Sequence, residues 1–265
     1  MNDAVYYEVN SIKDYIAMIE ELPNGQEGYY YRGENRRYAT QSSSLLRSGI
    51  VRLLRDNPEY YVDAVNDYVR EMADQAGEWE REHVLAWCHH EGLPTNLLEL
   101  TASPLRALYF ACLSRTDHSE EPSQAGYVYG FARESTADVT ELILENVEME
   151  ASRYNLIEDM VDDPRWINLL SDHDTKGFHK PDLAQIPYLI YQAPYKYRGS
   201  DEPNGLYFYQ LFQTVSSSCS PEFSFEIMQQ QYAPSLIVKV SNQTEIREQL
   251  HHRDGSASMI GFPFE

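Results

Sequence analysis

The stretch GLPTNLLELTASPLRALYFA, residues 92–111, runs from the end of one predicted helix into the next. Apolar spacing places the first of these helices at about 78–90. Gly92 and Pro94 then end it, because glycine and proline commonly follow a helix C-terminus. We therefore expect the chain to turn at residues 92–94, before the apolar part of this stretch.

The second helix begins at Ser103 and Pro104. Serine is a favoured N-cap, and proline is favoured in the first turn, where a missing N–H costs nothing. The residues that follow, 105–113, are apolar on nearly every side. We therefore expect this helix to be buried.

Outward from this stretch, strands and helices follow from the hydrophobic pattern and from turn and capping residues. Strands are expected at 5–9, 28–32, 126–131, 188–191, 206–212 and 236–240. Further helices are expected at 12–22, 59–76 and 139–170, and after the capping pair Asn242 and Glu245. The helices come mostly early and the strands mostly late, which is typical of the α+β class.

We expect one compact domain over residues 1–265, with a helical N-terminal half packed on a mainly antiparallel sheet. Residues 28–115 carry the signature motifs, and residues 138–175 form an acidic helical insertion. The predicted buried core consists of Leu97, Leu98, Leu105, Leu108, Phe110, Val128, Phe131, Leu236 and Val238.

The formal charge of the 265-residue chain is −21, from 21 Lys and Arg against 42 Asp and Glu. General binding to a nucleic-acid backbone is therefore not expected, and neither is binding to an anionic membrane, because both need positive charge. No stretch approaches the roughly 18 apolar residues of a membrane span. The N-terminus lacks a signal-peptide pattern, and three cysteines form no disulfide framework, so we expect a cytoplasmic protein.

The arginines gather near the N-terminus. Residues 29–55 contain six arginines and one acid, Glu34, whereas residues 138–175 contain eleven acids and two arginines. A cluster of guanidinium groups suits a phosphate or carboxylate ligand, which it can bind through paired hydrogen bonds. Pairing of these arginines with the acidic stretch is an equally open interpretation.

Two motifs resemble the FRG domain, a bacterial family named for its Phe/Tyr-Arg-Gly motif. The first is Tyr31-Arg32-Gly33, and the second runs from His90 to Ala111 and matches the family pattern at most positions. The resemblance covers most of the chain from Tyr29 onward. The second motif departs from that pattern at four positions, which are His89, Asn96, Glu99 and Leu100.

The chain also resembles ADP-ribosyltransferases of the Arg/Ser/Glu type at the level of motifs. Arg32-Gly33, Thr101-Ala102-Ser103 and 107–111 follow the order of that family's elements. The resemblance implies an ADP-ribosyltransferase-like fold and use of NAD. Arg32 would bind the pyrophosphate, and Gly33 would let the backbone approach the ligand closely. A late carboxylate would stabilise the cationic ribosyl group.

The candidate residues follow from these resemblances. The catalytic candidates are Glu222 and Glu226, with Gln210 as the alternative occupant of that position. The candidates for cofactor binding are Arg32, Gly33, Thr101, Ser103, Glu99, His90, Tyr109 and Gln210. No metal ligand set is expected, because the HExxH and paired CxxC spacings are missing from the sequence.

We expect Arg32, Glu99, Thr101 and Ser103 to lie in one pocket of positive potential that takes a small anionic ligand or a nucleotide. Structural roles remain open: Arg32 can pair with a carboxylate such as Glu99, the hydroxyls can cap the buried helix, and His90 can bond the turn at 92–95.

Two function classes also remain open. One is nucleotide binding with ADP-ribosyltransferase-like use of NAD, and the other is a non-catalytic protein-interaction module in phage or stress defence.

Overall fold

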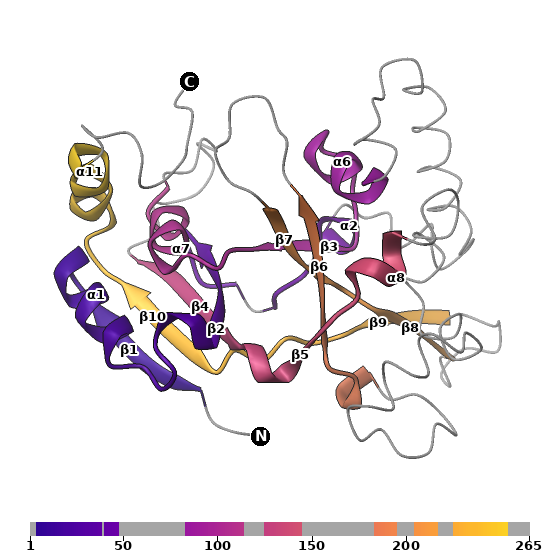
Figure 1. Ribbon diagram of the computed structural model, residues 1–265. Helices are drawn as coiled ribbons and strands as arrows, with labels where there is room; N and C mark the ends of the chain where they lie inside the picture. Colours follow the sequence, from indigo (N-terminus) through magenta and orange to yellow (C-terminus); the bar gives the residue numbers. More distant parts are fainter. Residues whose placement is uncertain are drawn as a thin grey trace.

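A computed structural model describes residues 4–38, 40–47, 83–113, 125–144, 183–194, 204–216 and 225–253 (Figure 1). The strands are β1 (Val5–Val9), β2 (Tyr29–Glu34), β3 (Leu97–Leu100), β4 (Gly126–Ala132), β5 (Thr136–Asp138), β6 (Tyr188–Pro194), β7 (Asn204–Tyr209), β8 (Phe212–Ser216), β9 (Phe225–Gln229) and β10 (Leu236–Val240). The α-helices are α1 (Ile12–Glu20), α2 (Ser44–Arg47), α6 (Val84–His90), α7 (Pro104–Ala111), α8 (Thr140–Leu144) and α11 (Gln243–Arg253). Short 3-10 turns lie at Gln26–Gly28, Arg133–Ser135 and Leu183–Gln185.

The described strands form two four-stranded sheets and a hairpin. The first sheet has the order β1-β10-β4-β2, the second has the order β3-β7-β6-β5, and β8 pairs with β9. β1 pairs with β10 and β5 with β6 in parallel, and the other pairings are antiparallel. Figure 1 shows the two sheets side by side, with α1, α7 and α11 against the first sheet.

Three apolar clusters hold these layers together. One packs α1, α7 and α11 on the outer face of the first sheet, and it includes Tyr15, Leu108, Val238 and Ile246. A second packs α6 and α8 on the second sheet. The third lies between the sheets, where the rings of Phe131 and Phe208 are 4.9 Å apart. The core thus continues from one helical layer to the other.

Helix α7 lies unusually close to the first sheet because the facing residues are small. A Cβ on Gly33 of β2 would overlap the Ala107 carbonyl oxygen and lie 2.9 Å from the Ala111 amide nitrogen. A Cβ on Gly126 of β4 would likewise overlap the Ala111 carbonyl oxygen. Ala107 and Ala111 are fully buried and lie one helical turn apart. Glycine is therefore required at both strand positions by helix packing.

The α+β class is confirmed, and the sheets are mainly antiparallel as expected. Strands β1 and β10 have the bounds expected from the sequence, 5–9 and 236–240. Ser103 caps α7 as expected, and its Oγ accepts a hydrogen bond from the Arg106 amide at 3.3 Å. The predicted core residues are buried except Leu105 and Phe110, which are half-buried.

Several expectations fall partly or wholly outside the described residues. The helix expected at 59–76 lies wholly outside, and so does most of the acidic insertion, of which α8 is the described part. Cys88 and Cys112 are buried free thiols, and Cys219 is also outside these ranges. No helix within the described ranges is long and apolar enough to cross a membrane.

The close approach of α7 predicts that Gly33→Ala will destabilise the protein severely. The added methyl would meet helix backbone, which cannot move without lifting α7, so we expect a loss of more than about 3 kcal/mol in the free energy of unfolding. Gly130→Ala in β4 is the matched control. Its Cβ would lie 3.0 Å from the Leu236 side chain, which can shift, so it should cost about 1 kcal/mol. Equal losses in urea denaturation would contradict the packing account.

Candidate functional site

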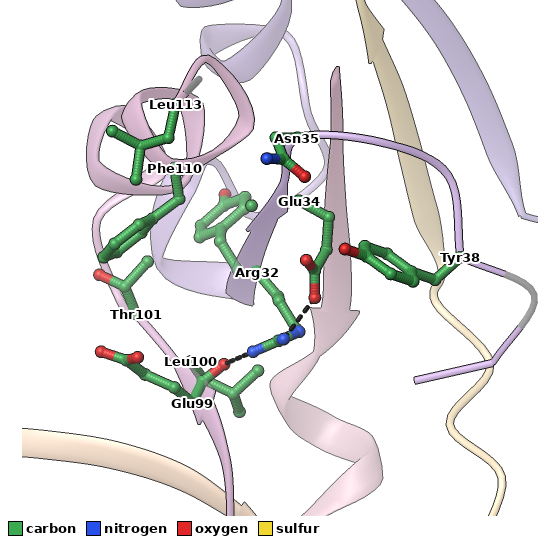
Figure 2. Close-up of a pocket in the computed structure, with 11 residues that line it drawn as sticks. Arg32, Glu34, Asn35, Tyr38, Glu99, Leu100, Thr101, Phe110 and Leu113 are labelled. Carbon is green, nitrogen blue, oxygen red and sulfur yellow. Dashed lines mark hydrogen bonds and ion pairs between the residues drawn. The ribbon is translucent and has the colours of Figure 1, made fainter. Parts of the chain in front are cut away.

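A cleft of about 310 Å³ lies at the free edge of β2, where β3 and α7 meet it. Figure 2 shows Arg32 at its centre, with Phe110 of α7 and Leu113, which follows that helix, on one side and Tyr38 on the other. The lining residues are Tyr31, Arg32, Gly33, Glu34, Asn35, Tyr38, Glu99, Leu100, Thr101, Phe110 and Leu113. The sequence predicted a cleft between these two motifs, and the structure brings Arg32, Gly33, Glu99 and Thr101 together in it.

The backbone bridge between Tyr31 and Thr101 joins the two sheets beside the cleft. Each residue donates its N–H to the carbonyl of the other at 2.8 Å. The Thr101 Oγ1 accepts from the Ser103 amide at 3.0 Å. Ser103 is exposed and is not among the lining residues, because its hydroxyl caps α7. Both hydroxyls thus bond the backbone where the chain leaves β3 for α7.

The Arg32 guanidinium is held by three protein groups. Its Nε donates to Gln41 Oε1 at 3.1 Å, its Nη1 donates to the Glu99 carbonyl oxygen at 2.7 Å, and its Nη2 pairs with the Glu34 carboxylate. The side chains of Arg32 and Glu34 are only 13% and 14% exposed. The structural interpretation of Arg32 is correct in kind, but its carboxylate partner is Glu34, whereas Glu99 contributes only its main-chain oxygen.

The carboxylate of Glu99 differs from that of Glu34 in its contacts. It makes no hydrogen bond or ion pair with any residue that the structure describes. Figure 2 shows it turned away from the Arg32 guanidinium, on the same side of the cleft as Thr101 and Phe110. The cleft therefore presents a carboxylate that is available to a ligand.

The charge of the cleft lining differs from the prediction. Among the described residues that line the cleft there is one cation, Arg32, and there are two carboxylates, Glu34 and Glu99, so the formal charge of these residues is −1. The prediction of a positive pocket rested on six arginines against one acid in residues 29–55, and it did not pair that acid, Glu34, with Arg32. Side chains two apart on a strand share a face, so the spacing of Arg32 and Glu34 already indicated an ion pair.

Gly33 contributes backbone groups to the cleft. Tyr31 directs its N–H and C=O to Thr101, away from β4, and alternate residues of an antiparallel strand direct these groups to the same edge. The N–H and C=O of Gly33 therefore also point away from β4, at the edge that β3 does not cover. Gly33 was expected to let the backbone approach a ligand; its missing side chain instead accommodates α7, while its peptide groups border the cleft.

Gln210 is fully buried and does not line the cleft. Its Oε1 accepts from the Ser43 amide at 2.8 Å, and its Nε2 donates to the carbonyls of Gln41 and Gln230. Asn96 Nδ2 donates to the Gln210 carbonyl oxygen at 3.2 Å. Gln210 thus joins segments that are distant in sequence, and through Gln41 it supports the position of Arg32.

The histidines and Tyr109 also lie beside the cleft rather than in it. The Nδ1 of His89 bonds the turn, with Thr95 Oγ1 at 2.8 Å, and the Nε2 of His90 lies 3.2 Å from the Tyr207 hydroxyl. Burial, together with the nearby His90, Arg32 and Arg47, lowers the pKa of His89 to about 4, so this ring adds no charge near the cleft at neutral pH. Tyr109 is half-buried and packs on the outer cluster of the first sheet.

The late glutamates remain predictions. Glu226 lies in β9 opposite Val215, and Glu222 lies outside the described residues. Among the described side chains, no group of three His, Cys, Asp or Glu residues is arranged to hold a metal ion.

The contacts of Arg32 predict that Arg32→Ala will destabilise the ligand-free protein. Removal of the guanidinium leaves the mostly buried Glu34 carboxylate without its cation, which should cost about 3 kcal/mol in the free energy of unfolding. Arg133→Ala is the control, since that side chain makes one hydrogen bond to the Tyr29 carbonyl and lies over the Tyr30 ring. It should cost only about 1 kcal/mol, and an equal loss for both variants would contradict the structural role of Arg32.

Comparison with known proteins identifies one family. The model of the FRG domain matches residues 27–120, which span β2, β3 and α7 and therefore every described element that lines the cleft. No curated protein matches the chain, and no solved structure matches it. The match includes both Tyr31-Arg32-Gly33 and the His90–Ala111 motif, so this chain is an FRG domain-containing protein.

Proposed function

We propose that the cleft binds the nicotinamide end of NAD and that the protein uses NAD in an ADP-ribosyltransferase-like reaction. The observation that carries this proposal is the open edge of β2 at Gly33. One residue there offers both an N–H donor and a C=O acceptor to the cleft. A primary carboxamide has the complementary acceptor and donor, so nicotinamide can bond both groups at once.

The other lining groups suit the same ligand. Phe110 offers an aromatic side chain against which a pyridine ring can pack. The surplus carboxylate of the lining favours a cation, and the oxidised nicotinamide ring of NAD carries a positive charge. The cleft is less suited to a nucleotide phosphate at its centre, because Arg32 is already paired with Glu34.

Glu99 is the residue that we propose for the chemical step. When the bond between the nicotinamide nitrogen and the ribosyl carbon breaks, the electron pair leaves with nicotinamide and the ribosyl group becomes cationic. Water or another acceptor then bonds that carbon and releases its proton to a base. The Glu99 carboxylate, which pairs with no residue that the structure describes, stabilises the cation and can take the proton.

Binding is tested by thermal shift and calorimetry with nicotinamide and nicotinic acid. Nicotinamide and NAD should raise the melting temperature, because they bind the native state. Nicotinic acid should bind about tenfold more weakly or worse, since its carboxylate cannot donate to the Gly33 carbonyl and is repelled by Glu99. Equal binding of the two would overturn the proposed site, and no binding of any nucleotide or nicotinamide would favour the interaction-module hypothesis.

The chemical step is tested by release of nicotinamide from NAD. Glu99→Gln should lower the rate by about a hundredfold or more while NAD still binds, because the charge is lost and the size of the side chain is kept. Glu134→Gln removes an exposed carboxylate in the turn after β4 and should leave the rate unchanged. An unchanged rate in Glu99→Gln would exclude the proposed role of Glu99.

A further inference from the structure

Glu34 supplies an anion to Arg32 from within the protein. The two side chains lie on the same face of β2, two residues apart, and they form an ion pair in the wall of the cleft. A carboxylate attached to the same strand is always close to the guanidinium. A dissolved anion that uses the same N–H group must displace it.

The remaining bonds of Arg32 fix the direction of its guanidinium. Gln41 Oε1 and the Glu99 carbonyl oxygen are neutral acceptors, so Glu34 supplies the only full negative charge among the three bonded groups. These three bonds use three of the five N–H donors of an arginine side chain. Without the Glu34 charge, the same fixed guanidinium would offer a cationic fork to the cleft.

We propose that Glu34 is an internal anion that occupies Arg32 and thereby makes the cleft select against phosphate groups. In the wild-type protein the cleft takes a neutral or cationic group, and loss of the Glu34 charge converts Arg32 into a site for phosphate anions. The proposal rests on the proposed function only for the location of the ligand, because its probe, inorganic pyrophosphate, contains no nicotinamide.

The test is binding of inorganic pyrophosphate to Glu34→Gln, measured by calorimetry at low ionic strength. Glutamine keeps the size of the side chain and an oxygen that can accept from Nη2, so the fold should persist. Affinity should rise by about tenfold or more over wild type, the gain expected when a cation is released to form a charge-assisted pair. The Glu34→Asp variant draws the carboxylate back by one methylene, and it should give a smaller gain with no change in net charge.

Glu8→Gln is the matched control for net charge. Glu8 lies in β1 at the opposite edge of the same sheet, in the row that runs through Lys239 and Tyr127 to Glu34, and it pairs with Lys239 at 2.9 Å. Glu8→Gln changes the net charge by the same amount as Glu34→Gln and should leave the affinity for pyrophosphate unchanged. The double variant Arg32→Gln with Glu34→Gln should lose the gain, because both the charge and the fork are then removed.

The outcomes separate this proposal from the proposed function. A gain in Glu34→Gln that is absent from Glu8→Gln and from the double variant supports the internal anion, whether or not nicotinamide binds. An equal gain in Glu8→Gln would show an effect of net charge and overturn it. No gain in either Glu34 variant would also overturn it, and would leave nicotinamide binding to be judged by its own experiment.

Discussion

The contact between Gly33 and the backbone of α7 is the constraint on which the cleft depends. At this point a strand and a helix touch without a side chain between them, with Ala107 and Ala111 on the helical side. Gly126 makes the same contact one strand further into the sheet. The two sequence motifs are therefore the two sides of one packing interface. The glycine of Tyr31-Arg32-Gly33 is needed because the alanines of the second motif lie directly above it.

This interface determines where the chemical groups lie. α7 begins at the cap formed by Ser103, directly after the backbone bridge between Tyr31 and Thr101. Beyond this bridge no described strand pairs with the edge of β2 that faces away from β4. The N–H and C=O of Gly33, the next peptide groups on that edge, therefore border the cleft. The alternation of the strand sends Arg32 and Glu34 to the other face, where they neutralise each other. The carboxylate of Glu99 pairs with no residue that the structure describes.

Local signals in the sequence predicted much of this arrangement. The start of α7 depends on Ser103 and Pro104, which act within one turn, and the strands at 5–9 and 236–240 follow from short-range patterns. Their pairing could not be predicted in the same way, because β1 and β10 lie at opposite ends of the chain. Arg32, Glu99, Thr101 and Ser103 were assigned to one cleft from the two motifs, and the structure places the first three of them there but not Ser103. The ion-pair partner of Arg32 was missed, although strand alternation indicated Glu34. The hydrogen bonds of Gln210 could not be predicted, because they join segments that are far apart in the sequence.

The most direct measurement of the central claim is a titration of glycine-labelled protein with nicotinamide, followed by the amide resonances of its 13 glycines. The account predicts that the Gly33 amide shifts on binding, since its N–H donates to the carboxamide. The Gly126 amide should stay in place, because that residue lies under the same helix but does not line the cleft. Saturable binding of nicotinamide that leaves the Gly33 amide unmoved would contradict the account.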